Sequence, residues 1–176
     1  MRINKWLGLG AGWILAGGPI GAIIGFAVGA FIDGNIQLKT NTSGKTTIND
    51  FAMSLIVLIA AVMRADGRIM KSELDYVKNF LSRTFGPEAA SELTILLRDV
   101  LNKEIEIDAV CVQIKQNLDY SSRLEMIHLL FGVSKADGII HFEEISIIER
   151  IASHLGITQH DFISIKAMFV EETDSA

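Results

Sequence analysis

The chain has 176 residues, 49% of them hydrophobic, and a formal net charge of −5 at pH 7. This length holds about one domain of ordinary size and a further segment. The negative balance argues against a nucleic-acid partner, which requires a basic surface. The one cysteine, Cys111, excludes an internal disulfide and a cysteine-based zinc finger, and its apolar neighbours predict a buried thiol in a reducing compartment.

The N-terminal stretch from Trp6 to Ile32 contains no charged residue. As one helix it is about 40 Å long, which exceeds the ~30 Å hydrocarbon core of a bilayer. Arg2 and Lys5 precede the stretch and Asp33 follows it. We therefore predict that residues 1–33 form a single-pass transmembrane anchor.

Four glycines in this stretch recur every four residues and share one helix face: Gly17, Gly21, Gly25 and Gly29. A stripe without side chains lets two membrane helices approach closely, so it predicts self-association of the anchor as a dimer. A cleaved signal peptide, or a helix kinked or folded into a hairpin at residues 17–19, stays open as an alternative. Basic residues flank both ends, so the charges do not set the orientation in the membrane.

The remainder of the chain is predicted to be helical. Residues 34–46 are polar and rich in turn formers, which is typical of a flexible linker. Apolar residues at helical spacing then predict seven helices, at about 51–63, 71–85, 87–100, 107–118, 122–133, 142–154 and 158–169. Three of them have a predicted cap: Thr47 before the first, Ser122 with Glu125 at the fifth, and Thr158 at the last. No stretch alternates as a strand does, so the predicted fold class is all-α. The domain covers residues 47–170, and an acidic tail follows at 171–176.

One short unit occurs twice in this domain. Ala-Asp-Gly at 65–67 recurs at 136–138, and an offset of 71 residues also pairs the apolar positions of the flanking helices. Ile69 and Ile140 follow the two turns and are predicted to be apolar anchors of the loops. A match across a whole helix-turn-helix predicts a duplication, and hence a bundle of two pseudo-equivalent halves.

Four acids of the repeated unit are the candidate site residues: Asp66, Glu73, Asp137 and Glu144. One interpretation is that each carboxylate caps the start of its own helix, where backbone N–H groups are free. The other is that the four converge as oxygen ligands of one divalent cation, Ca²⁺ or Mg²⁺. Each copy alone has too few acids for an EF-hand, so only a site pooled from both copies has enough ligands.

The doubled Ala-Asp-Gly-x-Ile unit, followed by an acid, resembles the TerB-like domain of tellurite-resistance proteins over about residues 47–169. The glycine-rich stretch before it is similar to the membrane anchor of DjlA-type J-domain co-chaperones. That resemblance implies a bacterial inner-membrane protein with its domain in the cytoplasm. It also implies an Hsp70 partner for a J domain that follows the TerB-like domain in this family.

The Hsp70-stimulating His-Pro-Asp loop of a J domain does not occur in these residues, whose two prolines are Pro19 and Pro87. We therefore expect either a truncated form or a relative without a J domain. No phosphate-binding loop, paired histidine spacing or recognisable catalytic triad is present, so we do not expect an enzyme. His128 lies in an apolar run and is predicted to be a core residue.

Two functions from different classes follow from these observations. The first is a membrane-anchored module that tethers a co-chaperone and recruits a protein partner. The second is a stress sensor that binds a divalent cation through its two Asp-Gly loops.

Overall fold

The structure is a computed structural model that describes residues 18–23 and 48–174. Within these residues there is a short helical segment at 19–23 and no strand, so the predicted all-α class is confirmed. The seven helices of the domain are α2 (Ile48–Met63), α3 (Lys71–Phe85), α4 (Pro87–Leu101), α5 (Ile107–Asn117), α6 (Tyr120–Ser134), α7 (Phe142–His154) and α8 (Gln159–Asp174).

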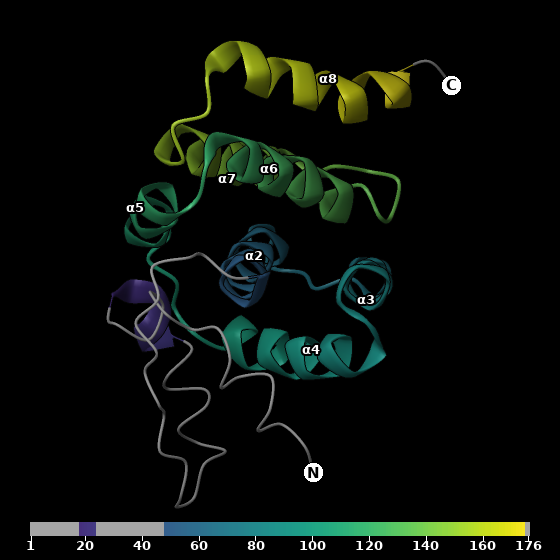
Figure 1. Cartoon of the computed structure of the whole chain (residues 1–176). Coiled ribbons are helices and arrows are strands. Elements are labelled where there is room, and N and C mark those ends of the chain that lie inside the picture. Colours follow the sequence, from purple (N-terminus) through teal and green to yellow (C-terminus); the bar gives the residue numbers. More distant parts are fainter. Residues whose placement is uncertain (1–17, 24–47, 175–176) are drawn as a thin grey trace, which may run out of the picture.

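The helices repeat in their order along the chain, with α2, α3 and α4 corresponding to α6, α7 and α8. In the middle of the bundle α2 packs against α6, while α3 contacts α6 and α7 contacts α2. The third helix of each half covers the outside, α4 against α2 and α3, and α8 against α6. Figure 1 shows this order, with α4 below α2 and α3 and α8 above α6 and α7. The two halves therefore share part of their packing, whereas the close contacts of α3 with α4 and of α6 with α7 have no counterpart of similar extent in the other half.

The centre of the core is α2. Every residue from Ala52 to Met63 is buried, because neighbouring helices cover this apolar helix on all sides. Its counterpart α6 buries Phe131, whose ring stacks on Phe169 at 5.6 Å between ring centroids. Burial of this kind is the main favourable term in folding the domain.

One predicted helix start is confirmed and one is wrong. Helix α2 begins at Ile48, directly after the predicted cap Thr47. A capping box from Ser122 to Glu125 was expected, and this prediction was wrong: α6 begins at Tyr120. Asp119 is its cap, because the Asp119 carboxylate accepts a hydrogen bond from the backbone N–H of Ser122 at 2.8 Å. An aspartate in extended conformation competes well for this position.

Two side chains are also placed differently from expectation. His128 is exposed rather than in the core, and its ring meets Phe169 edge-on at 5.0 Å between centroids. Ile69 was expected to anchor the first Asp-Gly loop in the core but is 47% exposed, whereas Ile140 in the second loop does pack against the core.

Most of the predicted anchor lies outside the described residues, as do the linker at 34–46 and three of the four striped glycines, Gly17, Gly25 and Gly29. The dimerisation stripe therefore stays a prediction. In the parts of the chain that the structure describes, no helix has the length and apolar character needed to cross a bilayer. Helix α8 continues to Asp174, into the stretch predicted as a tail.

Candidate functional site

The two Asp-Gly loops lie at the same end of the bundle, where α2 leads into α3 and α6 leads into α7 (Figure 1). Each loop has the same local structure. Asp66 accepts a hydrogen bond from the backbone N–H of Arg68 at 2.9 Å, and Asp137 accepts one from Ile139 at 3.0 Å. The glycine after each aspartate has a positive φ, +76° at Gly67 and +91° at Gly138, a conformation that glycine adopts without strain.

The glutamate that follows each loop caps the next helix. The Glu73 carboxylate accepts from the backbone N–H of Met70 at 3.2 Å, and Glu144 accepts from His141 at 2.9 Å. Glutamate at the third position of a helix reaches back in this way to satisfy a backbone donor that has no partner in the helix. The capping interpretation of these two acids is therefore correct as far as each helix start is concerned.

The two glutamates are also buried against each other, which capping alone does not require. Glu73 is 3% exposed and Glu144 is 1% exposed. Burial, together with the neighbouring Glu144 carboxylate, raises the pKa of Glu73 to about 8. Burial likewise raises the pKa of Glu144. Removing a carboxylate from water disfavours its charged form, so the buried pair holds a proton near neutral pH.

One buried oxygen of Glu144 has room for a hydrogen bond from that proton. Oε1 of Glu144 is buried and receives no hydrogen bond from an N–H or hydroxyl group of the described residues. A protonated Glu73 supplies the missing donor, since the hydrogen bond between the two side chains favours the acid form of Glu73 and the ionised form of Glu144. The pair is thus a carboxylic acid and a carboxylate that share one proton.

The two aspartates do not complete this pair as ligands of one ion. Each is bonded within its own turn, although the negative charge of Asp66 raises the pKa of both glutamates. Across residues 18–23 and 48–174, no three histidine, cysteine, aspartate or glutamate side chains are grouped as a metal site. The structure brings together Glu73 and Glu144, with Asp66 near enough to act on them through its charge.

Apolar side chains on the outside of the same loops were missed in the sequence. Four large ones are exposed there: Ile69 at 47%, Met70 at 40%, Ile139 at 64% and Phe142 at 77%. Beside the second loop, a hollow of about 350 Å³ is lined by Gly138, Ile139, Ile140, Ile145 and Val170. A group of large apolar side chains exposed to solvent is typical of a binding surface. The signal in the sequence was Ile69 and Met70 shortly after the first Asp-Gly pair and Ile139 directly after the second.

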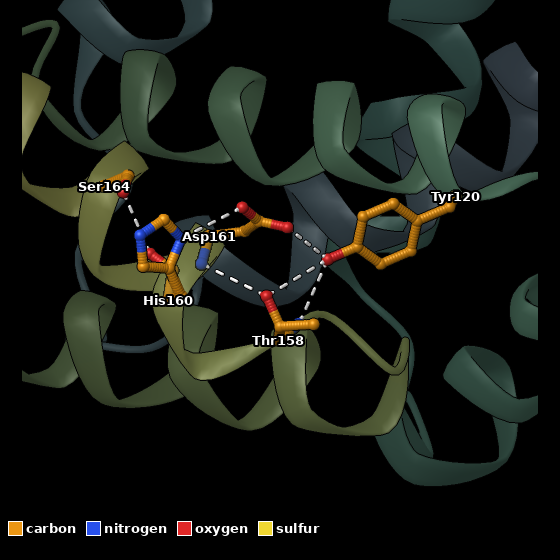
Figure 2. Close-up of polar contacts among 5 residues, drawn as sticks. All are labelled: Tyr120, Thr158, His160, Asp161 and Ser164. Atoms are coloured by element: carbon orange, nitrogen blue, oxygen red, sulfur yellow. Dashed lines mark hydrogen bonds and ion pairs between the residues drawn. The ribbon is translucent and has the colours of Figure 1, made fainter.

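A second polar group lies at the start of α8, and Figure 2 shows its residues. The Tyr120 hydroxyl donates to Asp161 at 2.6 Å and accepts from the backbone N–H of Thr158 at 3.1 Å. Thr158 caps α8 as predicted, because its hydroxyl accepts from the Asp161 N–H at 3.2 Å. The hydrogen bond from Tyr120 is the main reason that the pKa of Asp161 is lowered. These contacts fasten α8 to the start of α6.

The same group contains a serine, a histidine and an aspartate, but their bonding is not that of a catalytic triad. The Ser164 hydroxyl donates to the backbone carbonyl of His160 at 2.9 Å, not to its ring. The His160 ring lies 3.5 Å from the Asp161 carboxylate at the surface. A nucleophile requires a base that accepts its proton, and Ser164 is not bonded to one here.

The fold and the two regions of the sequence define a class: an all-α domain built from a doubled helix-loop-helix unit and preceded by a glycine-rich apolar segment. Comparison with protein families assigns both regions. The family described as tellurite resistance protein TerB matches residues 52–167, and the co-chaperone DjlA transmembrane domain matches residues 1–46. The chain therefore belongs to the TerB family and carries a DjlA-type membrane segment. Neither the curated proteins nor the solved structures compared with the chain gave a match.

Proposed function

We propose that this chain is the membrane-anchored module of a DjlA-type co-chaperone and that its TerB domain recruits a protein partner of the Hsp70 system. The matched DjlA-type segment supports the attachment to a membrane. In this proposal the anchor crosses the inner membrane once, self-associates through its glycine stripe, and leaves the domain in the cytoplasm. The module has no J-domain activity and no catalytic activity of its own.

The observation that carries the recruitment step is the exposed apolar cluster on the two loops, formed by Ile69, Met70, Ile139 and Phe142. The domain follows the membrane segment in the chain and begins at the start of α2, whereas the first loop follows the end of this helix. Sixteen residues of helix separate the two points by about 24 Å. The cluster therefore lies away from the tether, which favours a soluble protein over the bilayer as its partner.

Binding of purified Hsp70 to the full chain in lipid nanodiscs tests this proposal. Phe142→Ser removes the most exposed apolar side chain of the cluster and is expected to weaken binding about tenfold or more, as at other interface anchors. Ile163→Ser is the matched control, because Ile163 is 55% exposed on α8, outside the cluster. Equal binding by both variants, or no binding by the unaltered chain, contradicts the proposal.

A second candidate function is a divalent-cation sensor, and the buried Oε1 of Glu144 favours it because that oxygen lacks a donor. A bound Ca²⁺ or Mg²⁺ takes the place of the shared proton, with Asp66 as a further ligand after its side chain rotates. The test is the melting temperature with each ion at constant ionic strength. Stabilisation that Asp66→Ala abolishes supports the sensor, and an unchanged melting temperature contradicts it.

A further inference from the structure

Residues 18–23 lie on the TerB domain although they belong to the apolar stretch. Figure 1 shows this short helix beside α5 and the end of α4. Ile20 is 0% exposed and is part of the hydrophobic core, and Ile23 packs against the same core. The domain therefore holds an apolar segment that is separate from it in the sequence.

The domain also forms hydrogen bonds with the backbone at both ends of this segment. At the start, the N–H of Ile20 donates to Oε1 of Gln113 on α5 at 3.0 Å, in a buried position. At the end, the Lys103 ammonium donates to the carbonyl of Ile23 at 3.3 Å. The N–H groups of a helix's first turn and the carbonyls of its last turn have no partner inside the helix. Gln113 therefore supplies an acceptor at the first end of the segment, and Lys103 supplies a donor at the last end.

The fit depends on glycine at position 18. Gly18 has φ +112°, and a Cβ on it would come within 3.0 Å of the Gln113 side chain. A residue with a side chain is therefore strained and crowded here. A continuous membrane helix makes the opposite demand, because its residues have negative φ and favour large apolar side chains.

The docked position and the membrane position exclude each other. Residues 18–23 lie near the middle of the uncharged stretch and inside the match to the DjlA transmembrane domain. Ile20 in the hydrocarbon core is beyond the reach of Gln113, because Gln113 belongs to the water-soluble bundle. Insertion of the anchor in a bilayer therefore requires that the segment leave the domain.

We propose that α5 and the α4–α5 connection form a binding site for a short apolar helix and that its occupant is residues 18–23 of the same chain whenever they are outside the bilayer. Gln113 and Lys103 recognise the two ends of this helix, and the core receives Ile20. Insertion of the anchor removes the segment from this site, so the domain differs between its inserted and uninserted forms.

Partition of the full chain into phospholipid vesicles tests the competition. Gly18→Leu destabilises only the docked state, and Gln113→Ala removes the buried acceptor. Each variant is expected to reach half-maximal insertion at about tenfold less lipid than the unaltered chain. The matched controls are Ala22→Leu, which adds an apolar side chain at an exposed position of the same segment, and Gln116→Ala, an exposed glutamine of α5.

Hydrogen exchange of the α5 amides provides a readout on the domain. In the unaltered chain they are expected to exchange at least several-fold faster after insertion than before it, since residues 18–23 then no longer cover α5. Gly18→Leu and Gln113→Ala are expected to show fast exchange without lipid. The proposal is overturned if Gly18→Leu partitions as Ala22→Leu does, or if α5 exchanges at one rate in both states.

Discussion

Replacing Glu73 by glutamine is the sharpest test of the shared proton. Glutamine keeps the size of the side chain, and its carbonyl can still accept from the Met70 N–H. Its amide N–H also donates permanently to the buried oxygen of Glu144, as the protonated acid does. The Glu73→Gln variant therefore mimics the protonated state of Glu73 at every pH.

The sign of the effect follows from the pKa of Glu73, which rises from 4.5 to about 8 on folding. Between these values the unfolded chain has released the proton and the folded chain still holds it, so stability falls as pH rises. Each pKa unit is about 1.4 kcal/mol, which gives a loss on the order of 4 kcal/mol across this window. Glu73→Gln is expected to match the unaltered protein near pH 5 and to be more stable near pH 8.5.

Urea unfolding of the full chain in one detergent, followed by circular dichroism at about pH 5 and pH 8.5, measures this difference. With a slope of about 2 kcal/mol per molar urea, the urea midpoint of the unaltered protein is expected to fall by about 2 M from pH 5 to pH 8.5. The midpoint of Glu73→Gln is expected to fall much less. Glu143→Gln is the control, because it removes an exposed acid next to Glu144. The reasoning is refuted if the unaltered midpoint is the same at both pH values, or if Glu73→Gln shifts both midpoints equally.

Three other acids titrate below this window, whereas burial raises the pKa of Glu92, whose contribution is common to the unaltered protein and Glu73→Gln. The pKa values of Asp108, Asp119 and Asp161 are lowered from 3.8. The stability that these three carboxylates contribute is complete above their ordinary pKa and is lost only as pH falls further. Their titration therefore ends before the range in which Glu73 releases its proton.

Three further changes test the packing and the anchor. Phe131→Ala is expected to cost about 3–5 kcal/mol in urea unfolding because it empties the stacked core, whereas Phe142→Ala, at 77% exposure, should cost little. Gly132→Ala brings a Cβ within 2.4 Å of the Tyr76 hydroxyl. Its cost in free energy of unfolding is therefore expected to be about 1–2 kcal/mol smaller in a Tyr76→Phe background, and equal costs in both backgrounds argue against this contact. Gly25→Ile should weaken self-association of the anchor in a membrane reporter assay, and an unchanged signal contradicts the glycine stripe.

The helices were predictable because their signals are local. Pro87 after Gly86 marks the start of α4, and the apolar run up to Met63 marks a helix buried on all sides. The start of α6 was not predictable, because Asp119 and Ser122 are both good caps and the sequence does not show which of them has the extended backbone. His128 shows the same limit: an apolar run in a sequence does not specify which helix face meets solvent.

The candidate site was predictable only in part. The duplication identified Glu73 and Glu144 as equivalent acids, and their capping role follows from their position in the first turn. Their direct contact depends on how the two halves pack, which no local pattern contains. The docked segment at residues 18–23 was missed for a similar reason, since a long apolar stretch has the same composition whether lipid or protein covers it.

The repeated unit explains why two like charges meet in the interior. Each copy places one glutamate in the first turn of a helix, and these helices, α3 and α7, both pack against the central pair α2 and α6. Glu73 and Glu144 are these two acids, and their burial next to each other disfavours two negative charges there. A shared proton or a bound cation resolves that conflict, and replacement of one copy by an apolar residue leaves its backbone donor uncapped. The pair thus links the stability of the loop end, where the apolar cluster is exposed, to the proton or cation that the two glutamates hold.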